Sequence, residues 1–282
     1  IRAYIVPHIG NVPLAKLGTT HVRTMLAALE AAGRSPRTAQ YARSVLRRAL
    51  RHAERDALVA RNVAALVDGP RSSATKLDDT LTASEARSVV TAAAGHRLEA
   101  LAVLVLELGL RKGEALGLLW SDVDLDVEEL TVRGTLKRGP QGLYVDTTKT
   151  ALAERTIPLP VGTADALRVH RTRQAEERLA AGPLWVDSDY VFSSEVGTPI
   201  DPRNALRWWK GLTRRAGVGE RRFHSSRHTA ATLMLDDGVP LEVVSAILGH
   251  ASLSITADVY ARVSKDAKRR ALTGLKARLG SQ

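Results

Sequence analysis

Residues 98–116 read LEALAVLVLELGLRKGEAL, and the glycine at position 109 divides this stretch into two kinds of sequence. The part before the glycine is strongly apolar, so it predicts a buried helix over about 97–109 that ends at Gly109. The apolar run is interrupted by two glutamates and is too short to cross a bilayer, so we expect no membrane partner. A chain of 282 residues, 44% of them hydrophobic, is long enough for a large core and for two domains.

Two charged residues follow the glycine. Arg111 stands where the apolar helix ends, so its guanidinium can be aimed into a cleft. Glu114 lies three residues further on and can hold that guanidinium by charge-assisted hydrogen bonds. Taken alone, such a pair is more often a surface salt bridge.

Three regions can be distinguished along the chain. Residues 1–67 have helical spacing throughout and predict a helical domain. Residues 68–81 are rich in turn formers and are interpreted as a linker. Thr82 and Glu85 form a capping box, which predicts a new helix and the start of a second domain over 82–282 with a C-terminal tail.

The first region carries most of the excess charge. Residues 1–76 hold 13 Lys/Arg and 4 Asp/Glu, a net charge of +9, whereas residues 77–282 hold 28 and 26, a net charge of +2. Ser35 and Pro36 predict a helix start, and steps of four place the arginines that follow on one face, which a DNA backbone could contact. An ordinary solvated face is the alternative. The candidate DNA-binding residues are Arg37, Arg43, Arg47, Arg51 and Arg55.

The middle of the chain changes to strand-like periodicity. Short strands are predicted over 130–133, 135–137, 143–145 and 156–159, with a turn at 139–142. Helical patterns resume after them. The predicted fold class is therefore mainly α with a small antiparallel β-sheet.

Two later segments add candidate chemistry. Residues 224–232 read HSSRHTAAT, in which His224 and Arg227 share a helix face and combine a proton carrier with a phosphate-binding fork. His224 and His228 could also suggest a metal pair, but the chain has no cysteine and no third ligand has an obvious place. Residues 248–252 read LGHAS, and Tyr260 follows.

The order Gly-Leu-Arg-x-x-Glu, His-x-x-Arg-His-Thr, Leu-Gly-His and then Tyr resembles the tyrosine recombinase, or phage-type integrase, family. Residues 5–17 and 207–217 are also similar to that family, so the resemblance covers most of the chain. It implies a helical core-binding domain and a mixed α/β catalytic domain that together clamp DNA. One departure is Ser225-Ser226, where the family usually has Asp-Leu, which bears on local packing more than on activity.

The resemblance also implies a chemistry. A tyrosine attacks the scissile phosphate, a 3′-phosphotyrosyl bond forms, and a 5′-hydroxyl leaves, with no metal, ATP or other cofactor. Glu114 would be a supporting residue. The catalytic residues implied by position are Arg111, Lys149, His224, Arg227, His250 and Tyr260.

The catalytic lysine of the family lies on a β-hairpin and protonates the leaving oxygen. Lys149 is the better match, and Lys137 on the preceding strand is the alternative.

The expected function is a site-specific recombinase that integrates or excises a phage or other mobile element. Its expected partners are double-stranded DNA, three further copies of the chain in a tetramer assembled on DNA, and accessory DNA-bending or excision factors. We expect it in the bacterial cytoplasm, on DNA. The alternatives are a chromosome-dimer resolving recombinase, a type IB topoisomerase-like enzyme, and a sequence-specific DNA-binding protein without cleavage activity. Nothing in the sequence resembles the arm-binding domain that many integrases carry, so we expect either a protein without one or a truncated chain.

Overall fold

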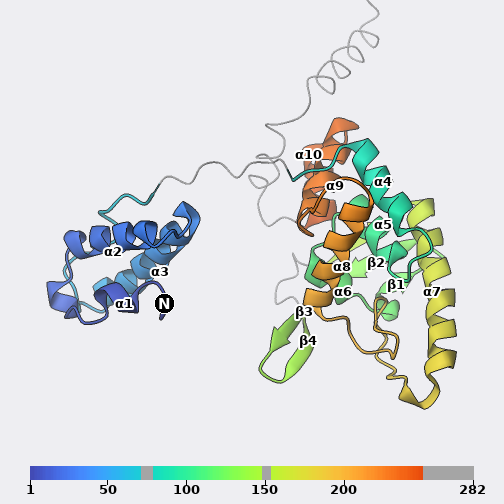
Figure 1. The fold of residues 1–282 in the computed structure, drawn as a ribbon, viewed down its shortest axis with the longest axis horizontal. Coiled ribbons are helices and arrows are strands. Elements are labelled where there is room, and N and C mark those ends of the chain that lie inside the picture. Colours follow the sequence, from blue (N-terminus) through green and yellow to red (C-terminus); the bar gives the residue numbers. More distant parts are fainter. Residues whose placement is uncertain (71–78, 148–153, 250–282) are drawn as a thin grey trace, which may run out of the picture. The chain divides into compact units, whose positions relative to one another are not determined.

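The computed structural model describes residues 1–70, 79–147 and 154–249. The chain divides into two compact units, Ile1–Leu77 and Asp78–Gln282, and each is described by itself (Figure 1). Among the described residues, no helix combines the length and the apolar character that a membrane span requires.

The described part of the first unit is helical. Its elements are α1 (Val6–Ile9), the 3-10 helix η1 (Leu14–Lys16), α2 (Thr19–Ala31) and α3 (Pro36–Arg55). The predicted start of α3 is confirmed, because the Ser35 hydroxyl accepts a hydrogen bond from the Thr38 backbone N–H at 3.2 Å and Pro36 is the first helical residue.

The core of this unit lies between α2 and α3. Gly33, with φ +69°, reverses the chain between the two helices, so that their apolar faces meet. The buried apolar side chains of these two helices are Val22, Met25, Leu26, Leu29, Ala39, Ala42, Leu46 and Leu50.

The second unit contains most of the helices and all the described strands. Its helices are α4 (Ala83–Ala93), α5 (Glu99–Glu107), α6 (Lys112–Leu116), η2 (Trp120–Asp122), α7 (Val161–Ala181), η4 (Gly182–Leu184), α8 (Pro202–Arg215), α9 (Ser225–Asp236) and α10 (Leu241–Leu248).

Helix α5 is the centre of this unit. It packs against α4, α6, α7 and α9, and every residue from 100 to 106 is buried, as its apolar sequence predicts (Figure 1). The capping box that starts α4 is confirmed: the Glu85 backbone N–H donates to the Thr82 hydroxyl at 3.2 Å, and the Glu85 carboxylate accepts from the Thr82 N–H at 2.8 Å.

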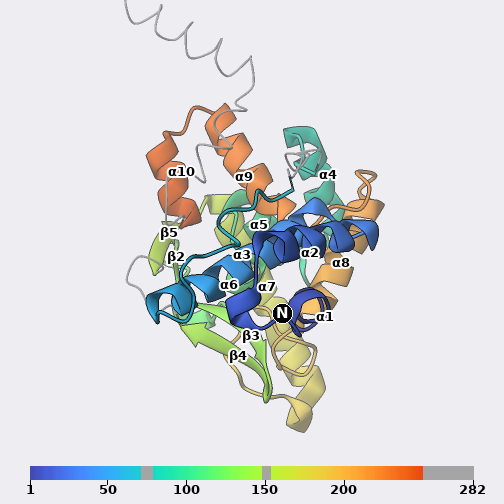
Figure 2. The same ribbon diagram turned by 90° about the vertical axis from the view of Figure 1, so that its left-hand side faces the viewer.

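The strands form two small antiparallel sheets, where one was predicted. The first has the order β1-β2-β5, with Leu130 opposite Ile157. The second is the β3-β4 hairpin, which projects from the body of the unit (Figures 1 and 2). The strands are β1 (Val123–Asp124), β2 (Glu129–Val132), β3 (Gly134–Gly139), β4 (Gly142–Thr147) and β5 (Arg155–Pro158). The mainly α class with small antiparallel sheets is thus confirmed.

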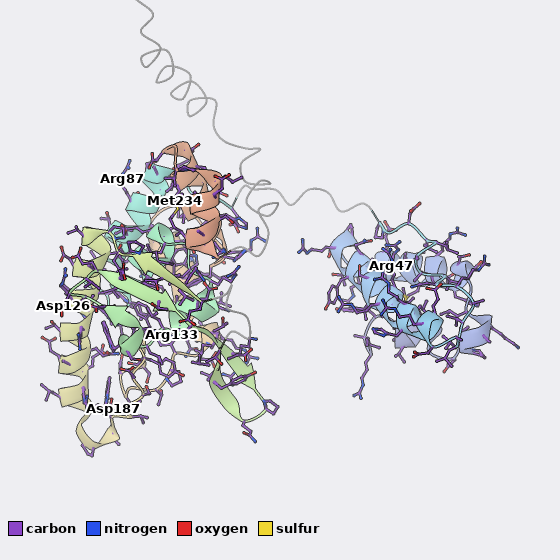
Figure 3. All side chains as sticks on the ribbon, turned by 180° about the vertical axis from the view of Figure 1, so that it is seen from behind. Arg47, Arg87, Asp126, Arg133, Asp187 and Met234 are labelled. Carbon is purple, nitrogen blue, oxygen red and sulfur yellow. The ribbon has the colours of Figure 1, made fainter. Side chains whose placement is uncertain are left out.

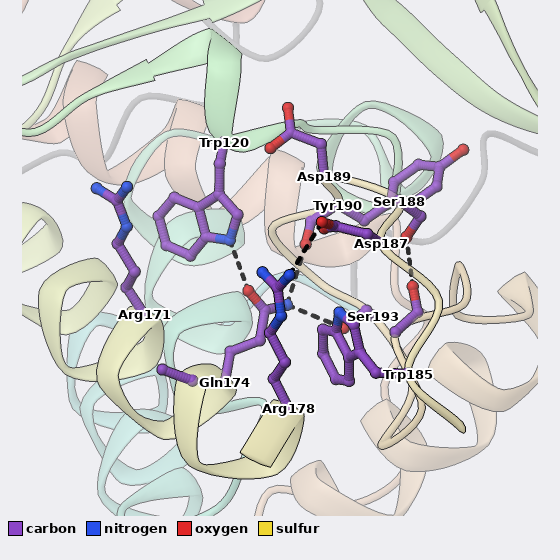
Figure 4. Close-up of a pocket in the computed structure, with 12 residues that line it drawn as sticks. Trp120, Arg171, Gln174, Arg178, Trp185, Asp187, Ser188, Asp189, Tyr190 and Ser193 are labelled. Carbon is purple, nitrogen blue, oxygen red and sulfur yellow. Dashed lines mark hydrogen bonds and ion pairs between the residues drawn. The ribbon is translucent and has the colours of Figure 1, made fainter. Parts of the chain in front are cut away.

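A pocket of 240 Å³ lies between α7 and the segment after it (Figure 4). Gln174 of α7 joins its walls: its side-chain oxygen accepts from the Trp120 indole N–H at 2.6 Å, and its amide nitrogen donates to the Ser193 hydroxyl at 2.9 Å and to the Tyr190 carbonyl at 3.0 Å. The Arg171 guanidinium lies over the Trp120 ring, 5.3 Å from its centroid. These contacts link α7 to Trp120 and to the segment after α7, so we interpret the residues around the pocket as structural.

Candidate active site

The turn between α5 and α6 carries the first candidate residue. Gly109 has φ +62°, and a Cβ atom at this position would lie 2.5 Å from Leu248 Cδ2 and 3.1 Å from Ala230 Cβ. Only glycine combines this backbone conformation with so close an approach. The turn therefore rests directly on α9 and α10, and Arg111, two residues later, emerges beside the end of α10.

Arg111 makes three hydrogen bonds at the start of α6. Its Nη1 lies 2.6 Å from Glu114 Oε1, its backbone N–H donates to Glu114 Oε2 at 3.0 Å, and its Nη2 donates to the Gly249 carbonyl at 3.0 Å. The Arg111 side chain remains 42% exposed, whereas that of Glu114 is 6% exposed. The carboxylate is thus a buried anchor, and the guanidinium that it holds still reaches solvent.

A second arginine shares that carboxylate. Arg155, the first residue of β5, donates from Nη2 to Glu114 Oε2 at 2.8 Å and from Nε to the Ile247 carbonyl at 2.7 Å. Burial alone would raise the pKa of Glu114, but the hydrogen bonds and charge of Arg155, together with the bonds from Arg111, outweigh it and lower that pKa. Glu114 is therefore ionised at neutral pH.

Arg227 is the most deeply buried cation of the group. It lies in the first turn of α9, is 3% exposed, and donates from Nη1 to the Gly109 carbonyl at 2.9 Å and from Nη2 to the Leu248 carbonyl at 2.6 Å. Burial and the neighbouring charge of Arg111 lower the pKa of Arg227 to about 9. The guanidinium therefore stays charged at neutral pH, and three arginines surround one carboxylate, which favours an anion beside them.

His224 occupies the N-cap position of α9, one turn before Arg227. The residue is exposed overall. Partial desolvation of the ring, the neighbouring His228 and the charges of Arg227 and Arg111 all lower the pKa of His224. Its ring stands edge-on to that of His228, with 4.9 Å between centroids. A neutral imidazole at this position can accept a proton near neutral pH.

The two serines that depart from the family pattern are buried and bonded. The Ser225 hydroxyl donates to the Arg222 carbonyl at 2.6 Å, and the Ser226 hydroxyl donates to the Phe223 carbonyl at 2.8 Å. Both bonds close the turn that leads into α9, so the serines hold the backbone between His224 and Arg227.

Three candidate catalytic residues, Lys149, His250 and Tyr260, lie outside the described residues. The alternative lysine, Lys137, is on β3, where its half-exposed ammonium lies 2.5 Å from Asp146 Oδ2. The hydrogen bond and charge of Asp146 raise the pKa of Lys137. The choice between Lys149 and Lys137 stays a prediction.

The candidate DNA-binding arginines of α3 divide into two groups. Arg43 is buried, at 9% exposure, and its Nε has no hydrogen-bond partner among the described residues. The remaining four are exposed, and Arg47 is labelled in Figure 3; they are Arg37, Arg47, Arg51 and Arg55. A DNA-binding role for this set stays a prediction.

Sequence reasoning overlooked Arg155 as a site residue. Its only local signal is its place at the start of the strand R-T-I-P, which follows the segment of Lys149. Its partners lie 41 and 92 positions away in the sequence, so no local pattern identifies them.

Comparison with known proteins gives one family and several relatives. The model of the phage integrase family matches residues 79–267. A XerC-like tyrosine recombinase of Caldanaerobacter subterraneus is 40% identical over 70% of this chain and 54% of its own length. An integrase of Streptomyces ambofaciens is 33% identical over 92% of this chain and 68% of its own length. The chain thus spans about half the length of the first relative and about two thirds of the second.

Solved structures share the fold. The Tn1549 transposon integrase, in complex with transposon right end DNA, superposes with a TM-score of 0.77 at 22% identity, covering 95% of this chain and 88% of that one. A lambda integrase dimer bound to a core site gives a TM-score of 0.66 at 20% identity, covering 91% and 68%. At these identities the likeness establishes the fold.

Proposed function

The chain belongs to the phage integrase family, and from that premise we propose that it is a site-specific recombinase that cleaves and rejoins double-stranded DNA through a tyrosine nucleophile, integrating or excising a mobile element. The observation that carries this proposal is the cluster around Glu114. Arg111 and Arg227, the two arginines of the family pattern, come together there from elements more than a hundred residues apart, with His224 one turn away.

The reaction is an exchange of phosphate esters. The Tyr260 hydroxyl oxygen attacks the scissile phosphorus and gives up its proton, the bond from phosphorus to the 5′ oxygen breaks, and a 3′-phosphotyrosyl ester remains. The 5′ oxygen leaves as a hydroxyl after taking a proton from Lys149. Because one phosphate ester replaces another, rejoining is the same reaction in reverse and needs no energy source.

The arginines stabilise the charge that builds up on phosphorus. In the pentavalent transition state, the non-bridging oxygens carry more negative charge than in the ground state, so fixed cations lower the barrier. Arg111 is accessible to a phosphate from solvent, and Arg227 lies behind it with a guanidinium fixed by two carbonyls. His224, with its lowered pKa, assists proton transfer, and His250 hydrogen-bonds the phosphate.

The first unit supplies affinity for the DNA backbone. The exposed arginines of α3 can neutralise phosphates without reading sequence, which suits a domain that positions the duplex. The lambda integrase relative is solved as a tetramer on a Holliday junction, and we propose that this chain also assembles as a tetramer on DNA in the bacterial cell. Accessory DNA-bending or excision factors would decide the direction of exchange.

A covalent-trapping experiment tests the proposal. Duplexes that the protein binds are first selected from a randomised library. The selected site is then made with a nick beside the cleavage point, so that the 5′-hydroxyl fragment diffuses away. We expect a slowly migrating covalent band on a denaturing gel for the wild type, without metal or ATP, and none for Tyr260→Phe. Binding without a covalent band at any nick position would overturn the enzyme proposal and favour a non-catalytic DNA-binding protein.

A further inference from the structure

The end of α10 carries the contacts that lead beyond the family pattern. Three consecutive carbonyls close this helix, and each accepts a hydrogen bond from a different arginine. Ile247 accepts from Arg155 at 2.7 Å, Leu248 from Arg227 at 2.6 Å and Gly249 from Arg111 at 3.0 Å. The last carbonyls of a helix have no partners within it, and cations suit the negative end of the helix dipole.

Only two of these three arginines belong to the pattern that implies phosphate binding. Arg155 differs from them because its second donor does not face a backbone carbonyl but the Glu114 carboxylate, at 2.8 Å. The side chains of both partners are almost fully buried, at 9% and 6% exposure. Arg155 therefore presents little surface to DNA, and its contacts run to the residues that hold the other arginines.

We propose that Arg155 is a positioning residue, which joins Glu114 to the end of α10 and so fixes Arg111 where it meets the scissile phosphate. This inference rests on the proposed function.

The contacts of Arg155 and Arg111 form a closed ring. Glu114 bonds both guanidiniums, through Oε1 to Arg111 and through Oε2 to Arg155. At the other side of the ring, Arg111 bonds the Gly249 carbonyl and Arg155 bonds the Ile247 carbonyl two residues earlier. Any movement of α10 relative to α6 must break a bond of Arg155, so Arg155 sets the distance across which Arg111 is held.

Gly249 adds a packing reason for the same conclusion. It has φ +65° and ψ 53°, and a Cβ atom at this position would lie 2.8 Å from Arg155 Nη1 and 3.0 Å from Arg155 Cζ. The backbone of Gly249 therefore lies directly against the guanidinium of Arg155. Arg155 determines the path of the chain at the residue that immediately precedes His250.

Lysine cannot replace these contacts. The guanidinium is planar and its donors point along fixed directions, so Nε and Nη2 can reach a carbonyl and a carboxylate at the same time. An ammonium is a point charge, which keeps the attraction to Glu114 but loses the carbonyl of Ile247. The substitution Arg155→Lys thus removes the carbonyl bond alone, and Arg155→Met removes the charge as well.

The experiment compares Arg155→Lys and Arg155→Met with the wild type on the same nicked duplex. Single-turnover cleavage, affinity for an un-nicked duplex and the melting temperature are measured for each. The control is Arg168→Met, because Arg168 of α7, like Arg155, bonds both carboxylate and carbonyl oxygens, those of Asp165, Glu128 and Leu125, away from α10.

We expect Arg155→Met to slow cleavage by about 10²-fold, the effect of a misplacement of about 1 Å, while affinity for the duplex changes by less than about threefold. Arg155→Lys should slow cleavage by about tenfold, between Arg155→Met and the wild type. Arg168→Met should cleave like the wild type. If Arg155→Met does not fold, Arg155→Lys decides the question at a melting temperature close to that of the wild type.

The pH profile separates positioning from a merely structural role. The charged groups around Glu114 are Arg111 at the N-cap of α6, Arg155 from β5 and Arg227 from α9. Without Arg155, the rise that burial causes in the pKa of Glu114 is offset less fully, so that pKa is higher. As the pH falls, Glu114 is then protonated earlier, and Arg111 loses its carboxylate partner at a higher pH. The acid limb of the cleavage rate should therefore move to higher pH in Arg155→Met and remain in place in Arg168→Met.

Each outcome bears on one of the two proposals. If the wild type gives no covalent band, the proposed function fails. If the wild type cleaves and Arg155→Met cleaves equally fast with the same pH profile, the positioning role is overturned while the function stands. A loss of cleavage that only parallels a loss of melting temperature, with an unshifted acid limb, also overturns it.

Discussion

The arginines of α3 and those around Glu114 differ in their exposure to solvent and in their hydrogen-bond partners. On α3, four of five candidate arginines face solvent. In the second unit, Arg155 and Arg227 are buried and bonded to backbone carbonyls, and Arg111 reaches solvent only from a fixed position. Exposed charges attract a polyanion over a distance and are screened by salt, whereas buried charges are screened much less and act on groups held close to them. We therefore propose that the same residue type supplies affinity for DNA in one unit and alignment of a phosphate in the other.

The largest effect is expected for Arg227→Ala. Cleavage of the nicked duplex should fall by about 10²–10³-fold, because a fixed cation beside the developing charge is lost. The free energy of unfolding should also fall by about 2–4 kcal/mol, since the carbonyls of Gly109 and Leu248 lose their donors in a buried place. Single-turnover cleavage and urea denaturation measure the two effects. The control is Arg87→Ala, at an exposed position of α4 labelled in Figure 3, which should change neither. Unimpaired cleavage by Arg227→Ala would remove the distinction between the two groups of arginines.

Glu114→Gln should have the next largest effect, a loss of cleavage of about 10²-fold through misplacement of Arg111. Its stability effect depends on pH. The pKa of Glu114 is lower in the folded protein than in the unfolded chain. Its contribution to the free energy of unfolding, about 1–3 kcal/mol, is therefore complete above the unfolded value of about 4.3. That contribution is lost as the pH falls through the lower folded value.

Urea denaturation of the wild type and Glu114→Gln at a series of pH values measures this dependence. The difference in the free energy of unfolding between the two proteins should be constant near neutral pH and should shrink below about pH 4. A difference that stays the same at every pH would show that the charge of Glu114 does not hold the cluster.

A smaller effect, on affinity alone, is expected when Arg47, Arg51 and Arg55 are all replaced by Gln. Binding to duplex DNA should weaken and its dependence on salt should become shallower, by about 0.9 in the logarithmic slope for each phosphate that the protein no longer neutralises. The free energy of unfolding should stay within about 0.5 kcal/mol of the wild type, because these side chains are exposed. Titration of a fluorescent duplex at several salt concentrations measures the slope, and an unchanged slope would exclude these residues from the DNA interface.

The smallest effect on binding is expected for Arg43→Met. Its side chain is buried and does not face solvent with the others, so the salt slope should equal that of the wild type. Arg47→Met, one turn further along, is the matched comparison and should lower the slope by about 0.9. If both substitutions lowered the slope equally, Arg43 would have to reach DNA and the division within α3 would be wrong.

Local sequence signals predicted the ends of elements well. Ser35 with Pro36, Thr82 with Glu85, and Gly109 each act on their own helix, and the structure places α3, α4 and α5 accordingly. The sequence did not show which of the α3 arginines would be buried. Each step of four turns the side chain by about 40° around the axis, so a stripe that faces solvent at Arg47 reaches the packed side at Arg43.

The candidate site was predictable only where the family pattern names a residue. Arg111, Glu114, His224 and Arg227 follow from motifs, and the structure brings the first two and Arg227 together at the end of α10. The sequence did not predict a role for Arg155, because that role depends on two partners that are distant in the sequence, Glu114 and Ile247. The split of the strands into two sheets was also missed, since pairing between β2 and β5 depends on contacts across the intervening hairpin.

The measurement that tests the central claim most directly is identification of the residue joined to DNA. After trapping on the nicked duplex, the adduct would be digested with protease and nuclease, and the modified peptide sequenced by mass spectrometry. We expect a phosphate-linked nucleotide on Tyr260, and a yield that falls sharply in Arg227→Ala but not in the triple α3 variant at saturating DNA. An adduct on another residue, or an equal yield in Arg227→Ala, would contradict the account.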